Sequence, residues 1–182
     1  MIAQVFERNR QRRTLVSLLM LPLSWLYRLM IALRRMGYRL GIFSSTKVAL
    51  PVVVVGNISV GGSGKTPMVI WLVRWLQQQG LKPGVILRGY GGNANEWPVL
   101  ISENTSAEQI GDEALLIHRS LGAPVVAGPV RVDDCRKLSH MDVNVIVSDD
   151  GLQHLAMRRD FELVMVNQAS MNKQCLITNL LR

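Results

Sequence analysis

A glycine-rich turn between a short apolar run and a helical segment constrains this chain more than any other feature of its sequence. Val52–Val55 is a β-branched run flanked by proline and glycine, which predicts a fully buried strand. The next segment contains Gly61, Gly62 and Gly64 and interrupts regular structure. Residues 65–79 then carry apolar side chains at helical spacing. A strand, a glycine turn and a helix in this order predict one unit of a parallel α/β sheet.

The spacing within this turn is close to that of a phosphate-binding loop. The pattern is G-x-x-x-x-G-K-[ST]; Gly64, Lys65 and Thr66 match its last three positions, and Ser59 replaces its first glycine. Such a loop points backbone N–H groups at a phosphate in front of the positive end of a helix. We expect Lys65 to reach the β and γ phosphates and the Thr66 hydroxyl to hold Mg²⁺. The alternative is a flexible turn that binds nothing.

The sequence thus predicts a site for ATP and Mg²⁺. Its nucleotide-binding residues are Ser59, Val60, Gly61, Gly62, Ser63, Gly64, Lys65 and Thr66.

The rest of the chain alternates between apolar runs and helical segments. Further strands are expected at residues 84–87, 124–127, 143–147 and 161–166, and helices at 111–121 and 130–140; residues 93–110 are polar and are expected to form a loop. The predicted fold class is therefore α/β, with a P-loop NTPase-like, mostly parallel sheet flanked by helices. Ligands of such sheets bind beyond the carboxyl ends of the strands, where the glycine loop, Arg88 and an aspartate pair fall.

Asp149 and Asp150 form that pair, directly after a buried strand. Phosphate-binding enzymes use a carboxylate at this place to hold Mg²⁺, directly or through water. We expect Thr66, Asp149 and Asp150 to form the metal site, and the spacing does not decide which aspartate faces the metal. The alternative is an Asx-turn that only ends the strand.

The first quarter of the chain has a different character from the rest. Residues 1–47 contain nine basic groups and one acidic group, a net charge of +8, whereas residues 48–182 contain twelve of each. A body without net charge argues against nucleic acid as a partner. The apolar stretch of residues 14–27 lies between arginines on both sides, and on a helix Ser17, Ser24, Arg28 and Arg35 would form a narrow polar stripe. We expect a membrane-associating helix on an anionic membrane surface; a partner-facing helix and a true transmembrane span are the alternatives.

Four motifs in a fixed order resemble a known family. They are Asn57–Pro67, Arg88-Gly89-Tyr90-Gly91-Gly92, Gly111-Asp112-Glu113 and Asp149-Asp150-Gly151-Leu152-Gln153-His154. Together they closely resemble the tetraacyldisaccharide 4'-kinases, the lipid A 4'-kinases of Gram-negative bacteria, over roughly residues 10 to 167. The hydrophobic, arginine-flanked N-terminus is similar to that family as well.

The resemblance implies a reaction and roles for particular residues. ATP would donate its γ-phosphate to the 4'-hydroxyl of a tetraacylated glucosamine disaccharide 1-phosphate at the cytoplasmic face of the bacterial inner membrane. The aspartate that acts on this hydroxyl would be Asp112, and Lys65 and Arg88 would contact phosphate. The residues alone favour Asp112 as an N-cap of the following helix. They leave Arg88 open as a turn residue, and His154 as either a structural histidine or a side chain near the site.

The chain departs from the family after Asn167. The family continues into a glycine-rich segment and a second lobe, which supplies a histidine that works with the catalytic aspartate; His118, His140 and His154 do not match that motif. We therefore expect three parts: a basic membrane-associating segment at 1–47, a kinase-like lobe at 48–167, and a divergent tail at 168–182 of a truncated product. This predicts nucleotide binding with little phosphoryl transfer. A membrane-associated P-loop ATPase or nucleotide-binding protein without lipid phosphorylation is the alternative function, and the oligomeric state is not predicted.

Overall fold

The computed structural model describes residues 21–57 and 64–166 of the 182-residue chain. The chain divides between Ser44 and Ser45 into two compact units, which are considered separately below. The predicted tail at 168–182 lies outside the described residues.

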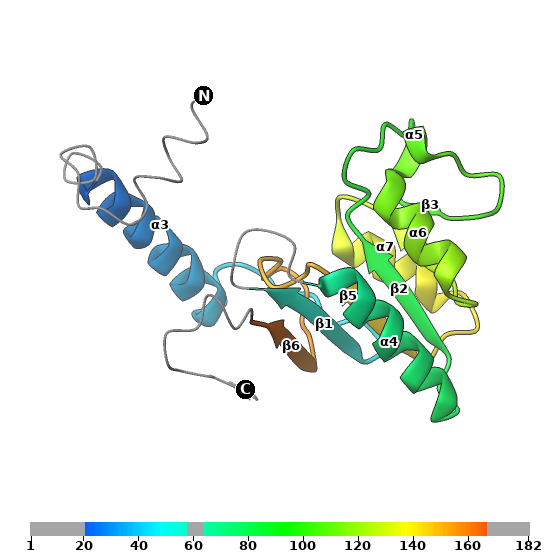
Figure 1. Cartoon of the computed structure of the whole chain (residues 1–182). Coiled ribbons are helices and arrows are strands. Elements are labelled where there is room, and N and C mark those ends of the chain that lie inside the picture. The colour runs from blue at the N-terminus through cyan, green and yellow to red at the C-terminus, as the bar shows by residue number, and fades with distance from the viewer. Residues whose placement is uncertain (1–20, 58–63, 167–182) are drawn as a thin grey trace. The chain divides into compact units, whose positions relative to one another are not determined.

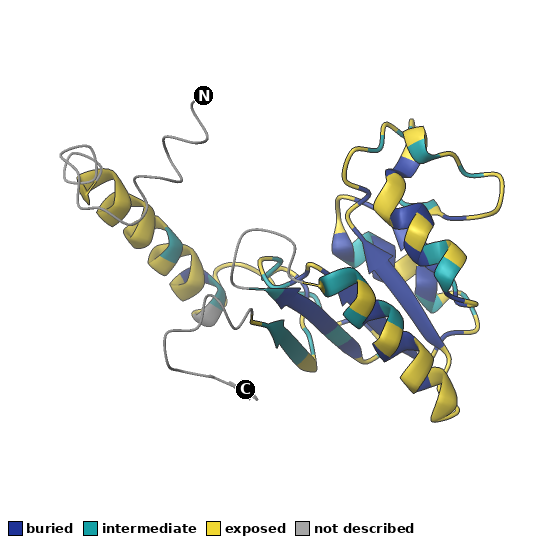
Figure 2. Ribbon diagram, in the orientation of Figure 1, coloured by how far each residue is buried: buried dark blue, intermediate teal, exposed yellow. Residues whose placement is uncertain are grey.

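The described part of the first unit, from residue 21 on, contains one long helix, α3 (Leu21–Arg39). Its large apolar side chains are exposed over most of its length (Figure 2), including Leu21, Leu23, Trp25, Leu26, Tyr27, Leu29, Met30, Leu33 and Met36. Among the described residues, no helix combines the length and the apolar character that crossing a bilayer requires.

The second unit is a six-stranded sheet with helices against it (Figure 1). The strands are β1 (Val52–Asn57), β2 (Pro83–Leu87), β3 (Val99–Leu100), β4 (Val125–Ala127), β5 (Val145–Asp149) and β6 (Phe161–Met165). The helices are α4 (Lys65–Gln78), α5 (Ala107–Ile110), α6 (Asp112–Ser120) and α7 (Arg131–Ser139). The spatial order is β3-β4-β2-β5-β1-β6, and only β3 pairs antiparallel with its neighbour. The predicted α/β fold with a mostly parallel sheet is confirmed.

Side chains alternate between the two faces of the sheet, because successive residues of a strand point in opposite directions. Val85, Val125 and Val147 belong to one apolar cluster, together with the buried residues of α4, α5 and α6. Ile86, Val126 and Ile146 belong to a second cluster, together with Cys135 and Leu138 of α7. Since both faces are covered, the strands read as continuous apolar runs, as expected for parallel strands.

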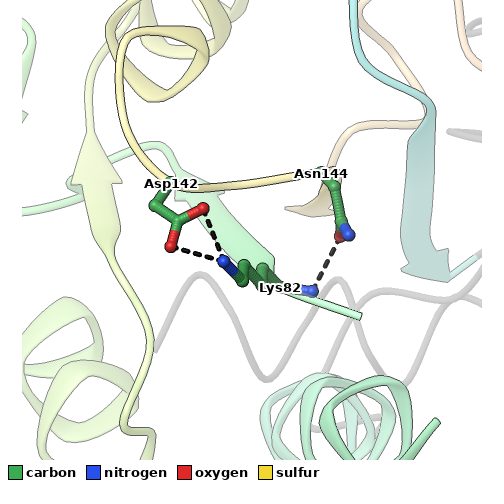
Figure 3. Close-up of polar contacts among 3 residues, drawn as sticks. All are labelled: Lys82, Asp142 and Asn144. Atoms are coloured by element: carbon green, nitrogen blue, oxygen red, sulfur yellow. Dashed lines mark hydrogen bonds and ion pairs between the residues drawn. The ribbon is translucent and has the colours of Figure 1, made fainter. Parts of the chain in front are cut away.

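Lys82, which precedes β2, is held to the segment that leads into β5 (Figure 3). Its backbone N–H donates to Asn144 Oδ1 over 2.7 Å, and its Nζ lies 2.8 and 2.6 Å from the two carboxylate oxygens of Asp142. These contacts are exposed, so the ion pair adds little stability. They join the amino ends of two neighbouring strands and support the pairing of Pro83 with Val145.

The prediction of a plain loop at residues 93–110 is wrong. This segment contains the short edge strand β3 and the single-turn helix α5. Ser106 caps α5: its side chain accepts from the backbone of Gln109, while the Gln109 side chain accepts from the Ser106 N–H. Polar composition hid both elements, because each is too short to show a hydrophobic period.

Candidate functional site

The predicted phosphate loop connects β1 to α4. Ser59, Val60, Gly61, Gly62 and Ser63 lie outside the described residues. Gly64 caps α4 with φ 71° and ψ 23°, the left-handed conformation that glycine adopts without steric cost. Lys65 and Thr66 form the first turn of the helix, which contains no acidic residue. The described end of the loop therefore has the backbone shape and the positive helix terminus that phosphate binding requires.

The aspartate pair lies beside this loop because β5 and β1 are neighbours. Val55 pairs with Asp149, and the Asp150 N–H donates to the Val55 carbonyl over 2.9 Å. Asp150 adopts a positive φ of 53° directly after the strand. Its Oδ1 lies 2.9 Å from Lys65 Nζ, and 64% of its side chain is exposed. The structure thus brings together two residues that are 85 positions apart in the sequence, and Asp150 is the aspartate that faces the lysine.

Asp149 has a different environment, because its side chain is buried. Only 5% of the residue is exposed, and its Oδ1 has no hydrogen-bond partner among the residues that the structure describes. Burial, supported by the charges of Glu113 and Asp150, raises the pKa of Asp149 to about 6, although Lys65 and Arg131 act in the opposite direction. A buried carboxylate surrounded by other carboxylates is one that a cation would stabilise.

Glu113 is a site residue that the sequence analysis named only as part of a motif. It belongs to the first turn of α6, and its Oε1 accepts a hydrogen bond from Thr66 Oγ1 over 2.7 Å. It also raises the pKa of Asp149, so it lies near two of the three residues of the predicted metal site, Thr66 and Asp149. Its place beside Asp112 in the first turn of α6 hid its role, because acidic residues in a first helical turn also stabilise the helix dipole.

Asp112 is exposed and is the first residue of α6. The alternative that Asp112 is the N-cap is wrong, because Gly111 occupies that position. As an acidic residue in the first turn, Asp112 also stabilises the dipole of α6, and its catalytic role stays a prediction.

Gly111 explains why two of the four motifs occur together. It adopts φ 85° and ψ 155°, a conformation that is essentially restricted to glycine, and a Cβ there would overlap the carbonyl oxygen of Tyr90. A Cβ on Gly92 would overlap the backbone of Gln109 and Ile110 in the same way. The loop that follows β2 thus packs directly on the start of α6. Arg88, the first residue of that loop, is exposed at the carboxyl end of β2, and its contact with phosphate stays a prediction.

Arg131 supports the aspartate pair from inside the protein. It is the first residue of α7, is only 3% exposed, and its Nη2 donates to the backbone carbonyl of Asp149 over 2.8 Å. Asp134, which is fully buried, lies 3.5 Å from Arg131 Nη1. Burial raises the pKa of Asp134 to about 7 against the attraction of Arg131, and it lowers the pKa of Arg131. No sequence pattern indicated this pair, because Arg131 and Asp134 look like ordinary charged residues of a helix.

The described residues contain no group of three or more histidine, cysteine, aspartate or glutamate side chains arranged to hold a metal ion. Mg²⁺ in nucleotide sites does not require such a group, since it binds through one or two protein oxygens, water and the substrate phosphates. A cavity of about 780 Å³ lies elsewhere, lined by residues such as Pro124, His118 and Met141 and by none of the predicted site residues.

The fold and the site define a class: a parallel α/β protein whose ligand site lies at the carboxyl ends of two adjacent strands, in front of a glycine-capped helix. The sequence profile of the family LpxK, described as tetraacyldisaccharide-1-P 4'-kinase, matches residues 16–179. The chain belongs to this family. The match continues past Asn167, where the sequence analysis expected the resemblance to end.

A solved structure agrees with the family match. The chain is similar to the crystal structure of the "apo" form of LpxK from Aquifex aeolicus in complex with ATP, with 34% sequence identity and a TM-score of 0.72. The similarity covers 80% of this chain and 47% of that chain, so this chain spans about half the length of that relative.

Proposed function

We propose that this chain binds ATP with Mg²⁺ and serves as the nucleotide-binding part of a tetraacyldisaccharide 4'-kinase. The observation that carries the proposal is the convergence of Lys65, Thr66, Glu113, Asp149 and Asp150 at one edge of the sheet. Family membership supports the kinase class, and the similar Aquifex protein was solved in complex with ATP.

The residues fit a divalent cation. Asp149 Oδ1 is buried without a hydrogen-bond partner among the described residues, and the charge of Glu113, which accepts from the Thr66 hydroxyl, acts on it. Oxygen ligands of this kind are those that Mg²⁺ prefers. Thr66 and the aspartates would hold the ion, which when bound neutralises phosphate charge. Lys65 would leave Asp150 and bind the phosphates. Because most of the Asp150 side chain is exposed, this ion pair is weak and is easily exchanged for a phosphate.

Transfer would take the γ-phosphate of ATP to the 4'-hydroxyl of the acylated disaccharide 1-phosphate. Asp112 would accept the proton of that hydroxyl, since it is exposed at the start of α6, next to the Glu113 that contacts Thr66. Arg88 would stabilise phosphate charge from the neighbouring loop. Asp112 and Arg88 are both exposed, so each can reach a bound substrate.

The N-terminal unit would place the site at an acylated substrate. The helix α3 contains four arginines and no acidic residue, and its apolar side chains are exposed. Such a helix suits the interface of an anionic membrane, here the cytoplasmic face of the bacterial inner membrane.

The test uses γ-labelled ATP, Mg²⁺ and the acylated disaccharide 1-phosphate in detergent micelles. The kinase is supported if label appears on the glycolipid, and if Asp112→Asn abolishes this labelling while nucleotide binding persists. Label found only in inorganic phosphate supports the alternative, a membrane-associated ATPase. Binding and transfer are measured separately, because the chain spans 47% of the Aquifex relative. ATP that neither binds nor reacts would overturn the proposal.

A further inference from the structure

The C-terminal end of α3 is closed by a Schellman motif. The Ile42 N–H donates to the Gly37 carbonyl over 2.9 Å, and the Gly41 N–H donates to the Tyr38 carbonyl over 3.3 Å. Gly41 has φ 74°, the left-handed conformation that this motif needs. The Phe43 N–H also donates to the Gly37 carbonyl, over 3.2 Å. These bonds turn the chain back along the helix that it has just left.

The reversal places the Phe43 ring against the helix at Gly37. A Cβ on Gly37 would lie 2.5 Å from the Phe43 ring, so only glycine permits this contact. The rings of Phe43 and Tyr38 have centroids 5.3 Å apart and are tilted by 46°, a favourable aromatic arrangement. Backbone bonds, a glycine and a ring pair therefore fix the shape of this corner.

Beside this corner lies an open hollow of about 340 Å³ lined by Leu33, Arg34, Tyr38 and Phe43. Three of these side chains are apolar or aromatic, and Arg34 provides the one charge among them. Leu33 and Phe43 are about half exposed, so the apolar walls are open to a ligand. No acidic residue is present anywhere in α3 to neutralise Arg34.

We propose that this corner is a lipid-binding pocket, which takes one acyl chain of a phosphorylated lipid between Leu33 and Phe43 while Arg34 binds the phosphate. An apolar wall gains free energy by covering a chain of methylenes, and an arginine at the rim binds a phosphate through a planar pair of donors. A neutral lipid would leave Arg34 without a counter-charge, and a free phosphate would leave the walls exposed. The pocket therefore selects both parts of an anionic lipid at once.

This inference goes beyond the interfacial role proposed for α3. A pocket of defined shape binds a single lipid that is dissolved in water, whereas an interfacial helix needs a membrane. Lipid binding and phosphoryl transfer can therefore fail independently of each other.

The experiment titrates the whole chain with dihexanoyl phosphatidic acid, kept below the concentration at which it forms micelles, and follows the heat of binding. We expect one saturable site. Gly37→Ala should weaken binding about tenfold, because its methyl group displaces Phe43 from the pocket wall. Arg34→Gln should weaken it about fivefold, through the loss of one phosphate contact. Inorganic phosphate and dihexanoyl phosphatidylcholine should bind much more weakly.

Matched controls separate the pocket from the helix as a whole. Arg35→Gln removes the neighbouring charge, and Met36→Ala removes exposed apolar surface, but neither residue lines the cavity. Both variants should keep the affinity of the unaltered chain. Phe43→Ala lies outside α3 and should reproduce the defect of Gly37→Ala, and circular dichroism confirms that α3 is intact in each variant.

Two sources of the lipid are told apart by competition. If the acylated disaccharide 1-phosphate displaces the short-chain lipid, the pocket is assigned to the substrate. If it does not, the pocket is assigned to membrane phospholipid. Either result supports the proposal, because both lipids carry the proposed chemistry. Equal losses in Arg34→Gln and Arg35→Gln, or unchanged binding in Gly37→Ala and Phe43→Ala, would overturn the proposal.

Discussion

Lys65 Nζ lies 2.9 Å from Asp150 Oδ1, which joins the first residue of α4 to the residue that follows β5. This ion pair connects the two halves of the proposed nucleotide site. It also means that, before nucleotide arrives, the positive charge intended for phosphate is shared with a carboxylate. Since most of the Asp150 side chain is exposed, the pair is weak enough to exchange for a phosphate.

The first prediction concerns Asp150→Asn. Without the carboxylate, Lys65 is free and the repulsion of phosphate is reduced, so affinity for ATP in the presence of EDTA should rise about threefold. The increase in ATP affinity on adding Mg²⁺ should be smaller than in the unaltered chain, because one oxygen ligand has lost its charge. Titration of a fluorescent ATP analogue with and without metal measures both effects. Asp142→Asn, which removes an exposed carboxylate paired with Lys82, is the control; equal behaviour of the two variants would contradict the assignment.

The second prediction separates two adjacent acidic residues. Glu113→Ala removes the acceptor of the Thr66 hydroxyl and a charge near Asp149, so Mg²⁺-dependent ATP binding should weaken about tenfold. Asp112→Asn should leave that binding unchanged, because its proposed partner is the acceptor hydroxyl. Equilibrium dialysis with ATP at several Mg²⁺ concentrations distinguishes them. If Asp112→Asn weakened Mg²⁺-dependent ATP binding more than Glu113→Ala does, the metal would lie at Asp112 and not at Glu113.

The third prediction concerns pH and Asp149, whose pKa of about 6 in the folded chain exceeds the ordinary value of 3.8. Between these values the folded chain keeps a proton that the unfolded chain has lost, so the free energy of unfolding falls as pH rises through this window. Above pH ~6 the carboxylate is ionised in both states, and its burial carries the full cost. Asp149→Asn should therefore stabilise the metal-free chain by about 3 kcal/mol at neutral pH, from about 1.4 kcal/mol per pKa unit.

Urea unfolding at several pH values, in EDTA, measures this effect. Asp134 also has a raised pKa and adds a slope of its own up to pH about 7, so the useful quantity is the difference between the unaltered chain and the variant. This difference should grow as pH rises from ~4 to ~6 and then level off. A difference that does not change with pH would show that Asp149 is not the titrating group.

The fourth prediction compares a buried ion pair with an exposed one. Arg131→Ala leaves Asp134 buried without a counter-charge and should cost about 3–5 kcal/mol, whereas Lys82→Ala should cost less than about 1 kcal/mol. Replacing both partners, as Arg131→Met with Asp134→Leu, should recover much of the loss, because two apolar side chains need no compensation. Chemical unfolding of the unaltered chain and of the three variants gives these energies. Equal costs for Arg131→Ala and Lys82→Ala would contradict the burial of the pair.

The buried strands and the long helices were readable from the sequence because their pattern is local. Val52–Val55 and residues 65–79 each carry enough apolar side chains to show a strand or a helix without knowledge of their neighbours. The strand order is different, since β1 lies between β5 and β6 through contacts that span about a hundred residues. No local pattern encodes that order, and it is what brings Asp150 to Lys65.

The site was predictable where its chemistry has a fixed spacing and not where it depends on packing. Lys65, Thr66 and the aspartates follow a known arrangement of strand, loop and helix. Arg131 acts through a backbone carbonyl of Asp149, and Glu113 acts through a hydroxyl on another helix. Such contacts depend on how α6 and α7 pack against the sheet, which single residues do not reveal.

The most direct test of the account is calorimetric titration of the purified chain with ATP and Mg²⁺. The account predicts saturable binding of one nucleotide per chain, which is lost in Lys65→Ala and kept in Arg74→Ala, since Arg74 lies later on the same helix and contacts the Ser120 carbonyl. Absence of binding, or equal binding by the two variants, would contradict the proposed nucleotide site.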